Sequence, residues 1–142
     1  FVFLLNAGTE ALEESRWEDA TDYFTLAYAL WPEEENQKRI RETQAAFYRK
    51  AAYQALDSGD RPLAIRHLHA LHQLEEDDVT ARILWKLSEE HVTESLAEAR
   101  RLHKEGKRDE AVAVLDEALQ VVQDQRLVDL RAELSGGSAP PR

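Results

Sequence analysis

The sequence predicts an all-α fold, a stack of antiparallel helix hairpins containing about six to seven helices. Three observations predict it. Ala, Leu, Glu, Gln and Arg dominate, with only 5 Gly and 4 Pro in 142 residues, a composition typical of helices. Runs of β-branched or aromatic residues at period two, which would indicate strands, are missing. One spacing of small and apolar residues also recurs three times, which indicates a repeated structural unit.

The first repeat lies near residues 1–32. Small residues at Gly8 and Ala20 allow two helix backbones to approach closely. Trp17 and Phe24 are large enough to fill the space between those helices. We therefore expect an antiparallel helix hairpin with a tight turn in the middle of this segment.

The three repeats are centred on turns at Ser15, Gly59 and Gly106. Small and apolar residues stand at matching distances from each turn, which places the later repeats near 45–76 and 92–123. Glycine adopts the left-handed conformation of a helix exit without a Cβ penalty. Each turn is therefore predicted to end one helix and connect it to the next.

The first repeat resembles the tetratricopeptide repeat, a helix–turn–helix unit with small and aromatic residues at fixed positions. The residues that carry the resemblance are Gly8, Trp17, Ala20, Phe24, Ala27 and Pro32. Ser15 replaces the turn glycine, and Arg61 and Arg108 stand at the aromatic position of the later repeats. The resemblance implies an α-solenoid over residues 1–134 that binds other proteins.

The repeats are longer than those of the family they resemble. Their turns lie 44 and 47 residues apart, compared with about 34 in the tetratricopeptide repeat. Apolar residues continue at helical spacing through residues 33–57 and 77–105. We therefore predict elongated first helices in the second and third repeats. A short additional helix in each is the alternative.

Helix starts have their own signals. Pro32 precedes three glutamates and is predicted to lie in the first turn of a helix. Asp60 and Asp109 are predicted to cap the helices that follow the second and third turns. A capping helix is expected at 125–134, and the Gly- and Pro-containing tail 135–142 is expected to be flexible.

Composition excludes several functions. The net charge of −10 argues against nucleic acid as a partner, because phosphate contacts need a basic surface. The apolar run at residues 1–5 is too short for membrane insertion. The absence of Cys excludes disulfides and Cys-based zinc sites, and is compatible with a cytoplasmic or a periplasmic setting.

No catalytic motif is present, so the sequence predicts a protein that is not an enzyme and needs no cofactor. One metal-binding alternative exists. His69, His72 and Glu76 would share a face if one helix carried all three. Exposed histidines are common on helices, and His67 points elsewhere, so we expect no metal site.

The tetratricopeptide resemblance also implies a partner-binding groove on the first helix of each repeat. The candidate groove residues are Leu5, Thr9, Leu12, Arg49, Lys50, Tyr53, Leu96, Arg100, His103 and Lys104. This set mixes apolar and basic side chains, which favours a protein or peptide partner with apolar anchors and carboxylates. Some aromatic residues are also candidates for partner anchors, because amphipathic rings serve both the margin of a core and binding surfaces: Tyr23, Tyr28, Trp31, Tyr48, Tyr53 and Trp85.

These observations favour a protein–protein interaction scaffold or adaptor within a larger assembly. The alternative is a self-associating structural module, because acidic residues cluster between 10 and 22 and basic residues between 100 and 108. Patches of opposite sign can join copies head to tail. A metal-binding helical protein is the third possibility.

Overall fold

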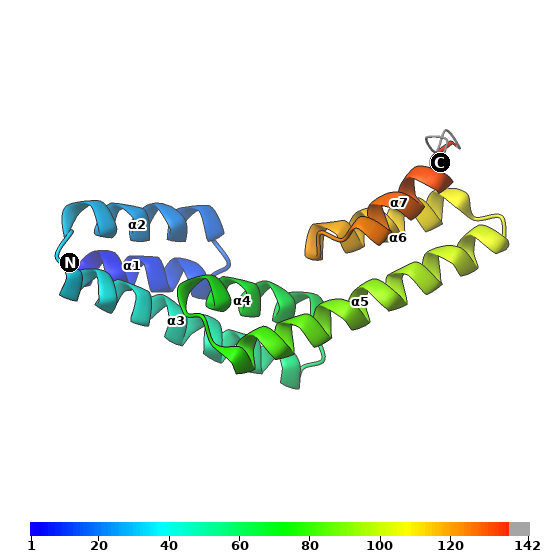
Figure 1. Ribbon diagram of the computed structural model, residues 1–142. Helices are drawn as coiled ribbons and strands as arrows, with labels where there is room; N and C mark the ends of the chain where they lie inside the picture. Colours follow the sequence, from blue (N-terminus) through cyan, green and yellow to red (C-terminus); the bar gives the residue numbers. More distant parts are fainter. Residues whose placement is uncertain (137–142) are drawn as a thin grey trace.

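The computed structural model describes residues 1–136, and within that range it contains seven helices and no strand (Figure 1). The helices are α1 (Val2–Glu13), α2 (Trp17–Leu30), α3 (Glu34–Asp57), α4 (Arg61–Leu74), α5 (Asp78–Lys104), α6 (Arg108–Val121) and α7 (Gln125–Leu134). The all-α prediction is confirmed. Most of the tail predicted to be flexible lies outside the described residues.

The three turns at Ser15, Gly59 and Gly106 share one backbone geometry. Their φ angles are +60°, +75° and +78°. At each turn the amide of the following residue donates to the carbonyl five residues before it, at 2.8 to 2.9 Å. This is the bond of a Schellman motif, which satisfies helix carbonyls that would otherwise lack a donor. The predicted equivalence of the three turns is therefore confirmed at the backbone.

Two of the predicted helix starts are wrong. Asp60 does cap α4, since its side chain accepts from the Leu63 amide at 3.1 Å. Asp109, however, lies inside α6, because Lys107 holds the position that Asp60 holds after its own turn. Pro32 lies in the connection before α3 rather than in its first turn.

The two longest helices are α3, with 24 residues, and α5, with 27. Each packs against different neighbours along its length. The first half of α3 packs on α1 and α2, where the Gln37 amide donates to the carbonyls of Tyr28 and Trp31 at 3.0 and 2.7 Å. Its second half pairs with α4. The prediction of elongated first helices is confirmed.

The buried apolar residues form separate clusters. The N-terminal cluster comprises Leu5, Ala11, Leu12, Ala20, Phe24, Ala27 and Ile40 from α1 to α3. The C-terminal cluster comprises Val92, Leu96, Ala99, Leu102, Ala111, Leu115, Ala118, Leu127, Leu130 and Leu134 from α5 to α7. Between them, α4 buries its own apolar face against the neighbouring helices.

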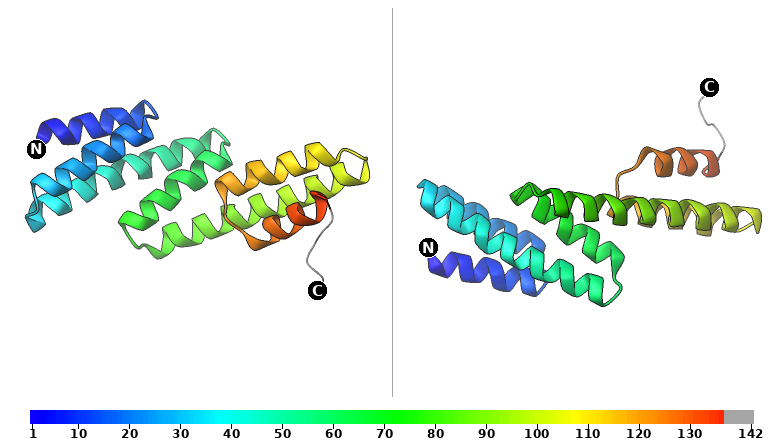
Figure 2. Two further views of the ribbon diagram at one scale, coloured as in Figure 1. Left: turned by 90° about the horizontal axis from the view of Figure 1, so that it is seen from above. Right: turned by 60° about the horizontal axis from the view of Figure 1, so that its bottom comes forward.

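The middle of the protein departs from a uniform stack. Helix α1 contacts α3 and α5 contacts α7, but α3 and α5 do not contact each other. The two halves are joined instead through α4, which packs on α3, α5 and the end of α6 (Figures 1 and 2). The molecule is consequently elongated, with α5 extending from α4 to the C-terminal helices.

Candidate functional site

Three candidate groove residues are core residues. Leu5 and Leu12 are only 4% and 3% exposed and belong to the N-terminal cluster. Leu96 is 7% exposed and belongs to the C-terminal cluster. Helix α3 packs across α1, and α7 packs across α5, so these leucines contact the protein's own helices. Leu5 and Leu96 therefore belong to the protein's own core and are not exposed to a partner, whereas Leu12, although nearly buried, also lines a second hollow.

Four other candidates lie on α1 and α3. The Thr9 hydroxyl donates to the Leu5 carbonyl at 2.8 Å and is half-buried. Arg49 pairs with Glu75, in the connection after α4, at 2.6 Å. Tyr53 is 59% exposed, and Lys50 is also exposed. Only the α3 members of this group are therefore placed to touch a partner.

The last three candidates, Arg100, His103 and Lys104, are exposed near the end of α5. Arg49 instead forms an ion pair with Glu75, which lies in the connection before α5. The 27 residues of α5 extend for about 40 Å at the rise of an α-helix. The structure therefore does not bring the predicted basic residues together into one groove.

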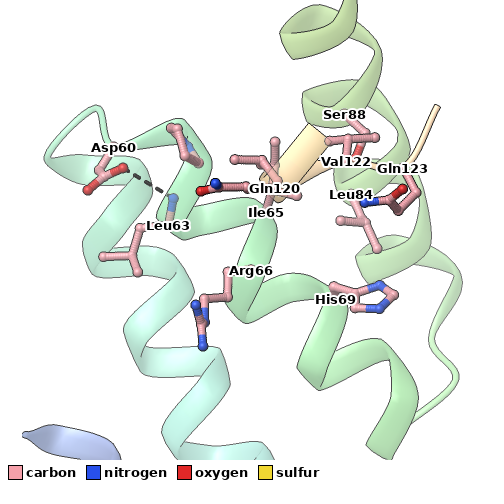
Figure 3. Close-up of a pocket in the computed structure, with 12 residues that line it drawn as sticks. Asp60, Leu63, Ile65, Arg66, His69, Leu84, Ser88, Gln120, Val122 and Gln123 are labelled. Atoms are coloured by element: carbon pink, nitrogen blue, oxygen red, sulfur yellow. Dashed lines mark hydrogen bonds between the residues drawn. The ribbon is translucent and has the colours of Figure 1, made fainter. Parts of the chain in front are cut away.

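A hollow lies where α4, α5 and the end of α6 meet, and we refer to it as the α4–α6 hollow (Figure 3). Its volume is about 750 Å³. The residues that line it are Asp60, Pro62, Leu63, Ile65, Arg66, His69, Leu84, Ser88, Gln120, Val121, Val122 and Gln123. None of them is in the predicted groove.

The lining of the α4–α6 hollow combines apolar and polar groups. Apolar side chains come from all three helices, among them Leu63 on α4 and Leu84 on α5. Gln120 adds an amide group from the end of α6, and Arg66 adds a guanidinium from α4. Gln123 adds a second amide from the connection after α6, where its nitrogen donates to the Leu119 carbonyl at 2.6 Å. Such a surface can cover apolar side chains while offering donors and acceptors to a peptide backbone.

Helix length explains why the hollow forms. Helices α4 and α6 have 14 residues each, so together they match the 27 residues of α5. Both pack on α5, and they contact each other only slightly where the start of α4 meets the end of α6. The gap between these facing ends is the hollow. Comparing the helix lengths predicted from the sequence could have revealed it.

Ion pairs hold α5 beside the hollow. Arg61, the first residue of α4, pairs with Glu94 at 2.5 Å. Arg126 of α7 pairs with Glu89 at 2.7 Å. Hydrogen bonds from these guanidinium groups lower the pKa of both glutamates, so their carboxylates stay charged well below neutral pH.

The structure separates the predicted metal-binding set at the end of α4. His67 is buried, whereas His69 is exposed and bonds to Gln73 at 3.1 Å. Helix α4 ends at Leu74, so Glu76 is not on the helix that carries the histidines. Across residues 1–136, no group of three or more His, Cys, Asp or Glu is placed to hold a metal ion.

Trp85 is the most exposed tryptophan, at 68%. It lines a shallow hollow on α5 with Asp78, Ala81 and Arg82. At this exposure, the ring is not covered by the other helices of residues 1–136. Exposed aromatic rings of this kind are frequent in protein interfaces.

Comparisons with known proteins found no match. No family model, no curated protein and no solved structure matches this chain. In the described part of the chain, no helix has the length and apolarity needed to cross a membrane. The functional assignment therefore depends on the geometry of the surface.

Proposed function

We propose that this protein is a protein-binding scaffold or adaptor within a larger assembly, and that a peptide segment of its partner occupies the α4–α6 hollow. The observation that carries this proposal is a hollow of about 750 Å³ with an apolar lining and amide groups at its edge. A volume of this size, and a lining that combines apolar side chains with a few polar groups, are typical of ligand-binding clefts. The sequence resemblance to tetratricopeptide repeats supports the same function.

The lining favours a partner segment of particular chemistry. Leu63, Leu84 and Val122 can cover apolar side chains of the segment. Gln120 and Gln123 can bond to its backbone, and Arg66 can pair with a carboxylate. We therefore expect an apolar segment with at least one acidic residue.

The proposal is tested by filling the hollow. Ser88 lines it and is half-buried on α5, whereas Thr93 is exposed on the same helix outside it. Ser88→Arg and Thr93→Arg add the same charge and a similar volume. Partners recovered from the native source by the unchanged protein should be lost with Ser88→Arg and retained with Thr93→Arg. Equal recovery by both variants, each with unchanged helix content, would contradict the proposal.

A self-associating structural module is the second candidate. Four apolar residues, Val2, Phe3, Leu26 and Leu30, are exposed on α1 and α2. These helices are antiparallel, so the start of α1 lies near the end of α2 (Figure 1). Association through this face predicts a mass that rises with concentration in light scattering and falls in Leu30→Lys. A constant monomer mass over the dilution series would reject it.

A further inference from the structure

His91 lies on α5 beside charged residues of α4 and α6. Both of its ring nitrogens, Nδ1 and Nε2, are buried without a hydrogen-bond partner. A neutral imidazole carries one donor and one acceptor, so here neither of the two is satisfied. Burying polar atoms without partners is costly, and each such group in a folded protein calls for an explanation.

Three charged residues face His91, one from each of the helices that meet here. Arg61 is the first residue of α4, Glu94 is on α5, and Glu117 is on α6. Arg61 ties α4 to α5, because its guanidinium donates to the Glu94 carboxylate at 2.5 Å. The hydrogen bond to Glu94 raises the pKa of Arg61, as do the charges of Glu94 and Glu90, so Arg61 stays positive.

The imidazole of His91 is neutral at pH 7. Burial lowers its pKa from the ordinary value of 6.5 and the charge of Arg61 lowers it further, whereas Glu94 and Glu117 act in the opposite direction. A protonated ring would place a second positive charge beside Arg61 and would carry two donors. Glu94 is one turn after His91 on the same helix, and it is the acceptor that Arg61 uses.

We propose that His91 is a pH-sensitive switch for the α4–α6 hollow, in which the protonated ring takes the Glu94 carboxylate from Arg61 and releases the start of α4 from α5. The proton comes from solvent, and no covalent bond changes. The structure with neutral His91 and an intact Arg61–Glu94 pair is the closed arrangement, and the structure without that pair is the released arrangement.

The switch acts on the walls of the hollow. Asp60 and Pro62, the residues on either side of Arg61, both line the α4–α6 hollow. Ser88 also lines it and stands one turn before His91 on α5. Release of Arg61 therefore frees one wall of the hollow from the other. The consequence for binding rests on the proposed function: a partner segment held between these walls should dissociate in acid.

Acid favours the released arrangement. In the closed arrangement burial and Arg61 keep the pKa of His91 below 6.5, whereas a ring exposed by release titrates near 6.5. The released arrangement therefore binds the proton at higher pH. Its equilibrium constant should rise as the pH falls below about 6.5, by up to about tenfold for each pH unit, until the lower pKa is reached.

Two NMR measurements on the whole chain test the switch between about pH 8 and about pH 5. The His91 ring should titrate with a pKa below 6.5, and Arg61→Gln should raise that pKa by removing the neighbouring charge. The Ala64 amide, which donates to the Asp60 carbonyl in the first turn of α4, should exchange with solvent faster as His91 is protonated. The exchange rate is corrected for its intrinsic pH dependence and compared with amides of α1, which report global unfolding.

Matched variants separate the switch from a general effect of acid. His91→Phe keeps a ring that cannot be protonated, so the acid response of α4 should disappear, whereas His103→Phe, exposed on the same helix, should retain it. Arg61→Gln leaves His91 in place but breaks the ion pair, so α4 should exchange fast already at about pH 8. Arg126→Gln breaks the pair that joins α7 to Glu89 and should leave α4 unchanged. The two arginine variants decide the question if His91→Phe fails to fold.

Three results would each overturn the inference: a His91 pKa at or above 6.5, an acid response that persists in full in His91→Phe, or equal exchange of α4 in Arg61→Gln and Arg126→Gln. These measurements need no partner, so they fail independently of the partner experiment. If the switch is observed but Ser88→Arg does not alter partner recovery, the binding proposal alone is rejected. If Ser88→Arg abolishes recovery but α4 does not respond to His91, the switch alone is rejected.

Discussion

Gly8 and Phe24 provide a quantitative test of how the first hairpin packs. A Cβ atom at Gly8 would lie 2.7 Å from Cζ and 2.8 Å from Cε2 of Phe24. The Phe24 ring is 2% exposed and packs within the N-terminal cluster, so an added methyl group must displace buried side chains. Gly8→Ala should therefore gain about 1 kcal/mol from helix propensity and lose about 1 to 3 kcal/mol from overpacking. We expect a net destabilisation of about 0 to 2 kcal/mol.

The sign should reverse when the ring is removed. Phe24→Ala alone should cost about 3 to 5 kcal/mol, because it leaves a cavity in the N-terminal cluster. In that background Gly8→Ala no longer meets the ring, so it should stabilise the protein by about 1 kcal/mol. The coupling between the two substitutions is then about 1 to 3 kcal/mol.

The assay is urea unfolding followed by circular dichroism for both single variants and the double variant. A second cycle pairs Gly8→Ala with Leu127→Ala, which removes a side chain from the separate C-terminal cluster. That cycle should show coupling within about 0.5 kcal/mol of zero. Equal coupling in the two cycles, or a stabilising Gly8→Ala in the otherwise unchanged protein, would refute the packing described for the first hairpin.

Three further predictions concern turns, caps and pH. Ser15→Gly should raise the free energy of unfolding by up to about 1 kcal/mol, because the left-handed φ of +60° is strained for serine and not for glycine. Gly59→Ala should lower the free energy of unfolding by about 1 kcal/mol for the same reason. Asp60→Ala should lower it by about 1 kcal/mol through loss of the cap, whereas Asp109→Ala, which removes no cap bond, should change it by a few tenths. Thermal unfolding of these four variants measures the changes in the turn pair and in the cap pair. Burial lowers the pKa of His67 from 6.5, so the unfolded chain binds this proton at higher pH than the folded protein. Stability should be full above about pH 6.5 and should fall as the pH drops towards the folded pKa. His67→Phe should flatten that fall in urea unfolding measured across this range, and an unchanged slope would argue against the neutral buried ring.

Helix ends were predictable because their signals are local. A residue with positive φ marks the end of α1, α3 and α5, and the sequence places Ser15, Gly59 and Gly106 at these positions. The error at Asp109 has an equally local cause. A cap must stand directly before the first helical residue, and Lys107 occupies that position. An acidic residue two positions later contributes only to the helix dipole.

Burial of the candidate groove residues was not predictable from periodicity. The spacing of Leu5 and Leu12 shows that one face of α1 is apolar, but not whether the protein's own helices or a partner cover it. In the structure α3 covers that face. Leu96 is buried in the same way by α7. Such contacts join distant parts of the chain, and a helical pattern within one segment carries no information about them.

Elongation of α5 is the physical origin of the α4–α6 hollow. Helix α1 has 12 residues, and its 14-residue partner α2 covers it fully. A helix of 27 residues is about 20 Å longer than its 14-residue partner α6, so the uncovered length must pack on the preceding hairpin. Helix α4 fills most of that length but leaves a gap beside Ser88. In this protein, helix length rather than the spacing of groove residues determines where the hollow lies that we propose as the partner site.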